Sequence, residues 1–244
     1  MLLQAIILSL ALTNPTPSPN PGRGAGGEGQ GEGLALVLID PKRYAFGLFD
    51  GLPHLARPVI QETDEATEAL QSLVRLMERR ALPDPSPAWA PGIVVVIDEL
   101  ADLLMTGGKA VQWALTRLTQ RGREAGIHVI AATQKPTAAV LGPLVKANFP
   151  VRLVGRVTGV EDARTATGWS GTGAERLAGR GDFLAVAEGR VIRFQAAHVS
   201  AEEIREVVAY LAQRGPAPAP DVPRPSLPWP HPLTRLAEVF TGGM

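Results

Sequence analysis

Ile93-Val94-Val95-Val96-Ile97-Asp98-Glu99-Leu100 is the stretch that decides the fold, because five consecutive β-branched residues run directly into two adjacent carboxylates. A segment that is apolar at every position, not at every second one, is typical of a strand buried on both faces of a parallel sheet. In an open α/β sheet, ligands bind just beyond the carboxyl ends of such strands. The stretch therefore predicts a buried strand that ends with Asp98 and Glu99 at a ligand-binding edge.

These two acids match the pattern of a Walker B segment in a P-loop NTPase. Such a site uses one carboxylate to hold Mg²⁺, usually through water, and a second to orient or deprotonate the attacking water. The alternative is a buried strand that ends in a solvated acidic turn. Short matches of this kind are common, so the rest of the chain has to decide between the two interpretations.

Three more apolar runs, at residues 34–39, 127–132 and 151–157, predict further strands. A helix is expected at 63–80, and a second one follows Glu99, with Gly126 at its end. Connections of this length between the four strands predict βαβ units and a mostly parallel sheet flanked by helices. The fold class is therefore α/β.

The last third of the chain has a different pattern. Residues 182–186 and 190–194 flank Ala187-Glu188-Gly189, which predicts a β-hairpin. Ser200-Ala201-Glu202-Glu203 is a capping box that opens a helix through about Leu211. Prolines dominate after that helix, so residues 213–244 are expected to form an extended tail.

Composition narrows the possible functions. The 244 residues suit one α/β domain or two small ones, and 24 basic side chains balance 24 acidic ones. No global basic field points to nucleic acid, so any DNA contact must come from locally placed side chains. The chain has no cysteine, which excludes disulfides and thiol chemistry, and its four scattered histidines lack the spacing of metal ligands.

The first twelve residues, Met1–Leu12, are nearly all apolar and carry no charged side chain. They have two interpretations, the apolar part of a signal peptide or a buried helix. No Lys or Arg precedes the segment, and it is too short to span a bilayer. Since its large apolar residues recur at helical spacing, we expect a buried helix and no membrane segment in this chain. The Pro- and Gly-rich residues 14–33 are expected to form a disordered low-complexity loop.

Eight motifs stand in an order that resembles the motor domain of the FtsK/SpoIIIE DNA translocases. They are Ile39-Asp40-Pro41-Lys42, Gly51-Leu52-Pro53-His54-Leu55, Met77-Glu78-Arg79-Arg80, Ile97-Asp98-Glu99-Leu100-Ala101-Asp102-Leu103, Arg123-Glu124-Ala125-Gly126-Ile127-His128, Ala132-Thr133-Gln134-Lys135-Pro136, Lys146-Ala147-Asn148-Phe149-Pro150-Val151-Arg152 and Asp162-Ala163-Arg164-Thr165. Each motif is weak alone, but eight in order are specific. The resemblance covers about residues 1–210 apart from the low-complexity loop, and it makes residues 1–212 part of a RecA-like motor domain.

The resemblance implies an ATPase that uses ATP and Mg²⁺ and assembles as a homo-hexameric ring around double-stranded DNA. In that family Asp98 matches the Mg²⁺-associated aspartate and Glu99 the glutamate that polarises water. Gln134 matches a polar sensor of the γ-phosphate, and Arg123 matches an arginine finger that acts on the nucleotide of a neighbouring subunit. The alternative for Arg123 is a solvated arginine at a helix end.

The resemblance also implies two DNA contacts. Lys135 stands in a loop that faces the pore, where the family usually has arginine, and Arg164 matches a basic residue of a second pore loop. Val160 departs from the lysine that usually stands four residues before Arg164, which weakens the expected phosphate grip. The alternative for both basic residues is ordinary surface charge. Phosphate contacts would make DNA binding dependent on salt and largely independent of base sequence.

The 244 residues contain no G-x-x-x-x-G-K-[ST] motif. In the family this phosphate-binding loop leads into a helix like Met1–Leu12, so we expect the chain to begin just after the loop and to have little or no ATPase activity alone. A non-catalytic ring or DNA-binding subunit and a related conjugation or secretion pump stay open as alternatives. The expected location is cytoplasmic, although full-length relatives are often anchored to the inner membrane. Chromosome partition at cell division, sporulation and plasmid transfer stay open as the process.

Overall fold

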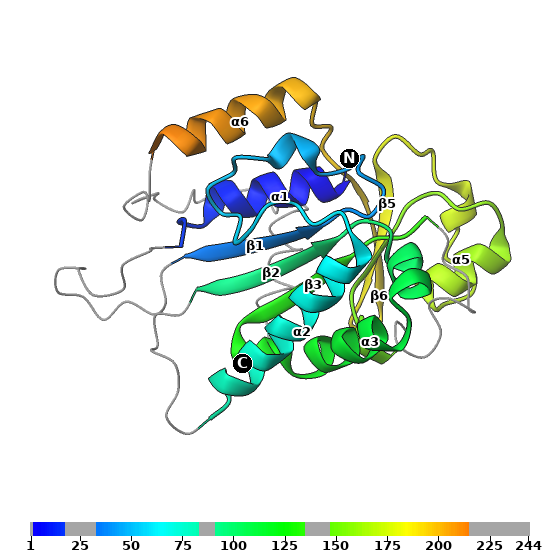
Figure 1. The fold of residues 1–244 in the computed structure, drawn as a ribbon. Helices are drawn as coiled ribbons and strands as arrows, with labels where there is room; N and C mark the ends of the chain where they lie inside the picture. Colours follow the sequence, from blue (N-terminus) through cyan, green and yellow to red (C-terminus); the bar gives the residue numbers. More distant parts are fainter. Residues whose placement is uncertain (1, 18–32, 83–90, 135–146, 215–244) are drawn as a thin grey trace. The chain divides into compact units, whose positions relative to one another are not determined.

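A three-stranded parallel sheet lies in the first of two units into which the chain divides (Figure 1). The computed structural model describes residues 2–17, 33–82, 91–134 and 147–214. The first unit runs to Phe149 and resumes at Ala197, and the second spans residues 150–196. Most of the predicted loop at 14–33 and nearly all of the predicted tail at 213–244 lie outside the described residues.

Three of the four predicted parallel strands form the sheet of the first unit. They are β1 (Leu34–Ile39), β2 (Gly92–Ile97) and β3 (Ile127–Ala131), with β2 in the middle. Ile39, Ile97 and Ala131 share one register position, so the residues that follow the three strands meet at one edge of the sheet. The helices are α1 (Leu2–Thr13), α2 (Thr63–Arg80), α3 (Leu100–Arg121) and α6 (Ala201–Arg214). The parallel α/β prediction is therefore confirmed for this unit.

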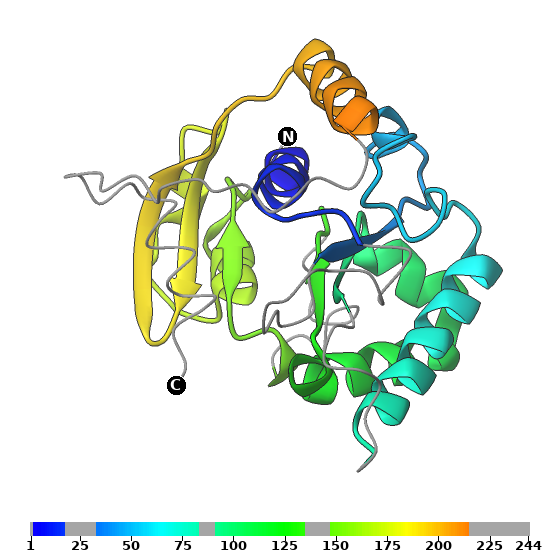
Figure 2. The same ribbon diagram turned by 90° about the vertical axis from the view of Figure 1, so that its left-hand side faces the viewer.

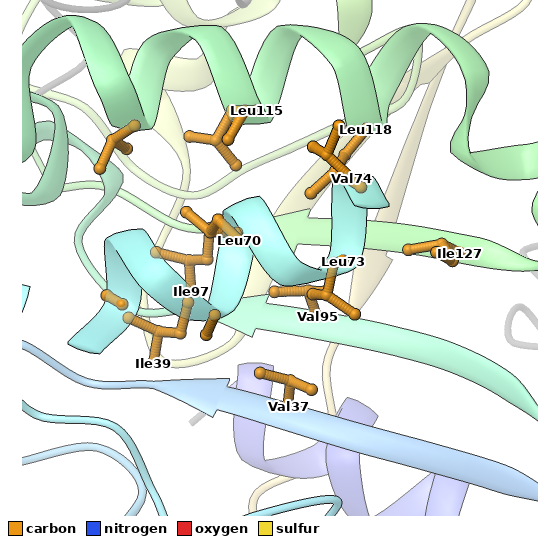
Figure 3. Close-up of a cluster of buried hydrophobic side chains, with 14 of the residues drawn as sticks. Val37, Ile39, Leu70, Leu73, Val74, Val95, Ile97, Leu115, Leu118 and Ile127 are labelled. Carbon is orange, nitrogen blue, oxygen red and sulfur yellow. The ribbon is translucent and has the colours of Figure 1, made fainter. Parts of the chain in front are cut away.

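Different helices cover the two faces of this sheet, which gives the unit three layers (Figure 2). The odd-numbered residues of β1 and β2 pack against α2 and α3, as Figure 3 shows for Val37, Ile39, Val95 and Ile97. The even-numbered residues pack with side chains of α1 and α6; they are Leu34, Leu36, Leu38, Val94 and Val96. Burial on both faces explains why these strands are apolar at every position, since each buried aliphatic side chain contributes about 1.5–3 kcal/mol.

Helix α1 confirms the prediction of a buried N-terminal helix, with Ile7, Leu8 and Ala11 in the core. Among the helices that the structure describes, none has the length and apolar character needed to cross a membrane. Asn14, just past α1, accepts a hydrogen bond at 2.9 Å from Nε2 of the fully buried His54. Burial lowers the pKa of His54, so the neutral imidazole fastens the end of α1 to the segment that follows β1.

That same segment covers the outer edge of β1. The backbone of Leu36 and Leu38 exchanges hydrogen bonds of 2.8–2.9 Å with residues 54–60, which run parallel to the strand. An edge paired in this way offers no open row of backbone groups to another chain. Strand β3 is less enclosed than predicted, because His128 is exposed and only Ile127 is fully buried among its five residues.

Helix α3 connects the end of β2 to the start of β3, and it is broken at Gly108. This glycine has φ 55° and ψ −141°, a conformation that residues with a Cβ rarely adopt. After Arg121 the chain tightens into the 3₁₀ turn Gly122–Ala125, and Gly126 ends it with a left-handed backbone. Helix α3 therefore consists of two rods, one that begins at the carboxyl edge of the sheet and one that ends at the amino edge.

The second unit has its own sheet, and this corrects one prediction. Strand β4 (Arg152–Val154) is shorter than the predicted 151–157 and pairs antiparallel with β5 (Asp182–Ala187), so it does not join the parallel sheet. A three-residue strand followed by Gly155 has too few apolar positions to occupy a sheet buried on both faces. The predicted hairpin is confirmed, because β5 pairs antiparallel with β6 (Arg190–Gln195).

Helix α5 (Val160–Thr167) and the 3₁₀ turn Ala174–Arg176 complete the second unit. Their buried residues form a small core with the sheet; it comprises Val154, Ala163, Ala174, Leu177 and Leu184. The predicted capping box is confirmed in the first unit. There the Ser200 N–H donates to Glu203 at 2.7 Å, and the Glu203 N–H donates to the Ser200 hydroxyl at 3.2 Å.

Candidate functional site

Glu99 occupies the turn between β2 and α3 with a left-handed backbone, φ 56° and ψ 66°. A left-handed conformation costs a non-glycine residue about 1–2 kcal/mol, so the neighbouring structure must hold it there. It does so from both sides, because the Asp98 N–H donates to Ile39 at 2.9 Å and the Leu100 N–H donates to Ala132 at 2.7 Å. The two carboxylates are thus fixed where the three strands end.

The Glu99 side chain is almost completely enclosed, with 1% of its surface exposed. Three described residues donate hydrogen bonds to its carboxylate. Lys42 donates to Oε2 at 3.0 Å, and the Thr133 hydroxyl donates to Oε1 at 2.5 Å. The backbone N–H of Gln134 lies 3.3 Å from both oxygens. Because buried carboxylates need paired charges and hydrogen bonds, this cage compensates for the burial of the Glu99 side chain and fixes its position.

Asp98 is half-buried beside Glu99. Burial raises the pKa of the Asp98 carboxyl, and the nearby carboxylates of Asp40 and Glu99 raise it further. A carboxylate under such repulsion gains from a bound cation. Among the described residues, no group of three or more His, Cys, Asp or Glu side chains is placed to hold a metal ion. Asp98 therefore fits Mg²⁺ that takes its other ligands from water and phosphate oxygens.

Asp40 follows β1 and shapes the turn next to Asp98. Its fully buried carboxylate accepts the N–H groups of Ala45 at 2.8 Å and Phe46 at 3.0 Å through Oδ2. Its Oδ1 has no hydrogen-bond partner in the part of the chain that the structure describes. These bonds fix the turn after β1, and that turn carries Lys42 to Glu99 and also to Asp102, whose Oδ2 lies 3.2 Å from the ammonium.

Arg123 lies at the other edge of the sheet, in the 3₁₀ turn before β3, whereas Thr133 and Gln134 follow that strand. The five residues of β3 separate the two edges by about 16 Å, which is farther than an arginine side chain reaches. Arg123 therefore cannot contact Glu99 of its own chain. Arg80 holds this turn in place by donating to the carbonyls of Ala125 at 2.7 Å and Pro91 at 3.0 Å. The backbone is also closely packed at Gly122, where a Cβ would lie 2.5 Å from a backbone oxygen.

The two candidate DNA contacts are placed differently. Lys135 lies outside the described residues. Arg164 lies on α5 of the second unit, a helix and not the expected loop, where it is exposed and paired with Glu161 at 2.8 Å. Val160 begins the same helix and is 61% exposed. The structure thus brings Asp98, Glu99 and the Gln134 backbone together, and it places Arg123 at the opposite edge.

Three residues of this site received no role from the sequence: Lys42, Asp102 and Thr133. Lys42 and Thr133 follow the two strands that flank β2, so the parallel pairing brings both beside Glu99. The sequence held the signal for them, since carboxyl ends of neighbouring parallel strands meet at one edge. Asp102 stands three residues after Glu99, which places it one helical turn away on α3.

Comparisons with known proteins agree with this geometry. The model of the FtsK/SpoIIIE family matches residues 29–82 and 84–138. The DNA translocase FtsK of Staphylococcus epidermidis is 38% identical over 204 residues, which cover 73% of this chain and 25% of that protein. The FtsK of Lactiplantibacillus plantarum is 39% identical over 200 residues, 72% of this chain and 25% of that protein. The chain thus spans about a quarter of the length of these relatives.

Two solved structures share the fold. The pCW3 conjugation coupling protein TcpA, in its monomer form with ATPγS, has a TM-score of 0.62 and 23% identity over 73% of this chain and 57% of its own. The cytoplasmic domain of the Thermomonospora curvata type VII secretion ATPase EccC has a TM-score of 0.65 and 22% identity over 89% of this chain and 27% of its own. The likeness to these two structures concerns the fold alone, whereas the family model and the identity to FtsK proteins lead to a further conclusion: the chain belongs to the FtsK/SpoIIIE family.

Proposed function

We propose that this chain is part of an ATP-dependent motor that translocates double-stranded DNA, and that it supplies the water-activating half of the ATPase site. The observation that carries the proposal is the arrangement around β3. Glu99 and the Gln134 backbone lie at one end of this strand, and Arg123 lies at the other. One chain therefore offers two different surfaces to phosphate chemistry, as a ring of identical subunits requires.

In this mechanism Asp98 would hold Mg²⁺ through water, and the ion would supply positive charge beside the phosphates. Glu99 orients the attacking water and accepts its proton, because its carboxylate is fixed by the donors of Lys42 and Thr133. Gln134 responds to the γ-phosphate from the next loop. Arg123 serves the nucleotide of a neighbouring subunit, where its fixed positive charge stabilises the transferring phosphoryl group. Hydrolysis then depends on the contact between subunits, and we propose a homo-hexamer.

The phosphates themselves need a further group. The 244 residues contain no G-x-x-x-x-G-K-[ST], whose backbone N–H groups, lysine and hydroxyl normally hold the phosphates and Mg²⁺. We therefore propose that hydrolysis requires such a loop in addition to the residues of this chain. Lys135 and Arg164 are the proposed contacts to the DNA backbone. For this contact the pair between Arg164 and Glu161 has to open, because the guanidinium exchanges the carboxylate for a phosphate. Opening costs little, since both side chains are exposed.

The experiment compares two forms of the protein. DNA-stimulated phosphate release is measured for the 244-residue chain and for an extended form, in which a G-x-x-x-x-G-K-[ST] loop is joined before Met1. We expect release only from the extended form, and we expect Glu99→Gln to abolish it. DNA-stimulated release from the 244-residue chain alone, lost on Glu99→Gln, would contradict the need for the loop.

A second measurement addresses the cargo. The likeness to TcpA and EccC keeps a related conjugation or secretion pump as the alternative, although both are less than 25% identical to this chain. The extended form is assayed for displacement of a third strand from a DNA triplex, which requires movement along the duplex. Movement at low salt that weakens as salt rises supports phosphate contacts. If DNA does not stimulate hydrolysis, and hydrolysis is not accompanied by movement along the duplex, the result supports the conjugation or secretion pump.

A further inference from the structure

Lys42 is the cation that contacts the buried Glu99 carboxylate in the part of the chain that the structure describes. Its Nζ lies 3.0 Å from Oε2 of Glu99 and 3.2 Å from Oδ2 of Asp102. The three side chains differ in exposure, with 34% for Lys42, 1% for Glu99 and 38% for Asp102. The ammonium thus bridges an enclosed carboxylate and an open one, although 57 positions separate Lys42 from Glu99 in the sequence.

The backbone that carries Lys42 is fixed independently of this contact. Asp40 accepts two N–H groups across the turn, and the Arg43 N–H donates to the Asp40 carbonyl at 3.1 Å. Arg43 itself has φ 63°, a left-handed residue that closes the turn. A lysine held at both ends, by its turn and by two carboxylates, limits where the Glu99 side chain can go.

The charge balance explains why a cation belongs here. Glu99 and Asp102 both contact the Lys42 ammonium. Asp40 and Asp98 follow neighbouring strands at the same edge of the sheet. A carboxylate that is buried without a charged partner is strongly unfavourable. Lys42 is such a partner for the enclosed Glu99, and without it Glu99 loses one of the donors that fix Oε2. A Glu99 side chain that moves in its cage is no longer a correctly placed acceptor for the proton of water.

We propose that Lys42 is a positioning residue for Glu99, and that Asp102 holds the lysine in place for this task. The role rests on the proposed function, in which Glu99 activates water. Lys42 acts through Glu99 and does not touch the reacting atoms itself. Its removal should therefore slow the chemical step and leave nucleotide binding nearly unchanged.

The kinetic test uses the form of the protein that hydrolyses ATP. We expect Lys42→Met to lower kcat about 10- to 100-fold, as loss of a supporting contact typically does, with KM for ATP changed about twofold or less. Lys42→Arg should regain part of the loss, because it restores the charge. Arg43→Met is the matched control, since Arg43 is in the same turn but pairs with the exposed Glu62. An unchanged kcat in Lys42→Met, a change confined to KM, or no recovery in Lys42→Arg overturns the proposal.

A second test needs no hydrolysis and uses the 244-residue chain. The melting temperature is measured for Lys42→Met in the wild-type background and in a Glu99→Gln background. We expect a smaller loss in the second, because the neutral amide needs no cation. Equal losses of melting temperature in the two backgrounds would contradict the proposed coupling between Lys42 and Glu99. If the wild-type motor hydrolyses no ATP, the proposed function fails, and this comparison still decides whether Lys42 and Glu99 are coupled.

Discussion

Mixing two inactive variants of the motor, Glu99→Gln and Arg123→Ala, should restore ATP hydrolysis that neither has alone. The expectation follows from the placement of these residues at opposite ends of β3, with a separation of about 16 Å that prevents both from acting on one nucleotide within one chain. Each active interface must therefore combine Glu99 from one subunit with Arg123 from the next.

The magnitudes can be worked out. Loss of a general base typically costs about 10²- to 10⁴-fold, and loss of an arginine finger costs about 10³- to 10⁵-fold, so each variant alone is nearly silent. In an equimolar mixture that assembles at random, about a quarter of the interfaces combine an intact Glu99 with an intact Arg123. The mixture should then regain up to about a quarter of the wild-type rate, an increase of more than tenfold over either variant.

The assay is phosphate release by the extended form on saturating duplex DNA. One variant carries an affinity tag, so that co-purification of the untagged variant proves mixed assembly. Arg121→Ala is the matched control for Arg123→Ala, since it removes an exposed arginine two positions earlier, and it should keep nearly full activity by itself. Proven mixed rings that show no recovery would refute the reasoning, and so would a fully active Arg123→Ala variant.

Three further predictions concern stability. Arg193 holds the pKa of Asp182 at about 2. Their pair therefore stabilises the fold fully above the unfolded-state pKa of about 4, and this stabilisation is lost as the pH falls toward 2. The loss of unfolding free energy in Arg193→Gln, measured with denaturant, should shrink over that pH window. Arg80→Met removes two charged hydrogen bonds and should cost about 3 kcal/mol in urea unfolding. Leu70→Ala should cost about 2–5 kcal/mol in the same assay, because Leu70 is fully buried between α2 and the sheet.

Local pattern was sufficient for the elements whose boundaries are marked in the sequence itself. Strand β1 and helix α2 have the predicted boundaries, 34–39 and 63–80, because an uninterrupted apolar run and a helical stripe each show where the element begins and ends. The capping box at Ser200 is equally local. For such elements the sequence and the structure agree, although the residues that bury β1 are distant in the chain.

Tertiary pairing decided what the pattern did not. The run at 151–157 was predicted to be a parallel strand, but only Arg152–Val154 forms a strand, and it pairs antiparallel with the hairpin strand β5. The hydrogen bond from Lys42 to Glu99 depends on which strands are neighbours, and no spacing rule over 57 positions expresses that. The break at Gly108 was not predicted, although Gly107-Gly108 is a pair of the kind that marks turns.

The left-handed backbone at Glu99 lowers thermal stability, whereas the proposed chemistry requires a glutamate at this position. Glycine and asparagine adopt this conformation with little or no cost, whereas glutamate bears about 1–2 kcal/mol of backbone strain there. A laboratory selection for heat resistance alone would therefore gain backbone stability by replacing the residue that we propose to activate water. Selection for DNA transport would keep the glutamate, so heat-resistant variants should gain their stability at other positions.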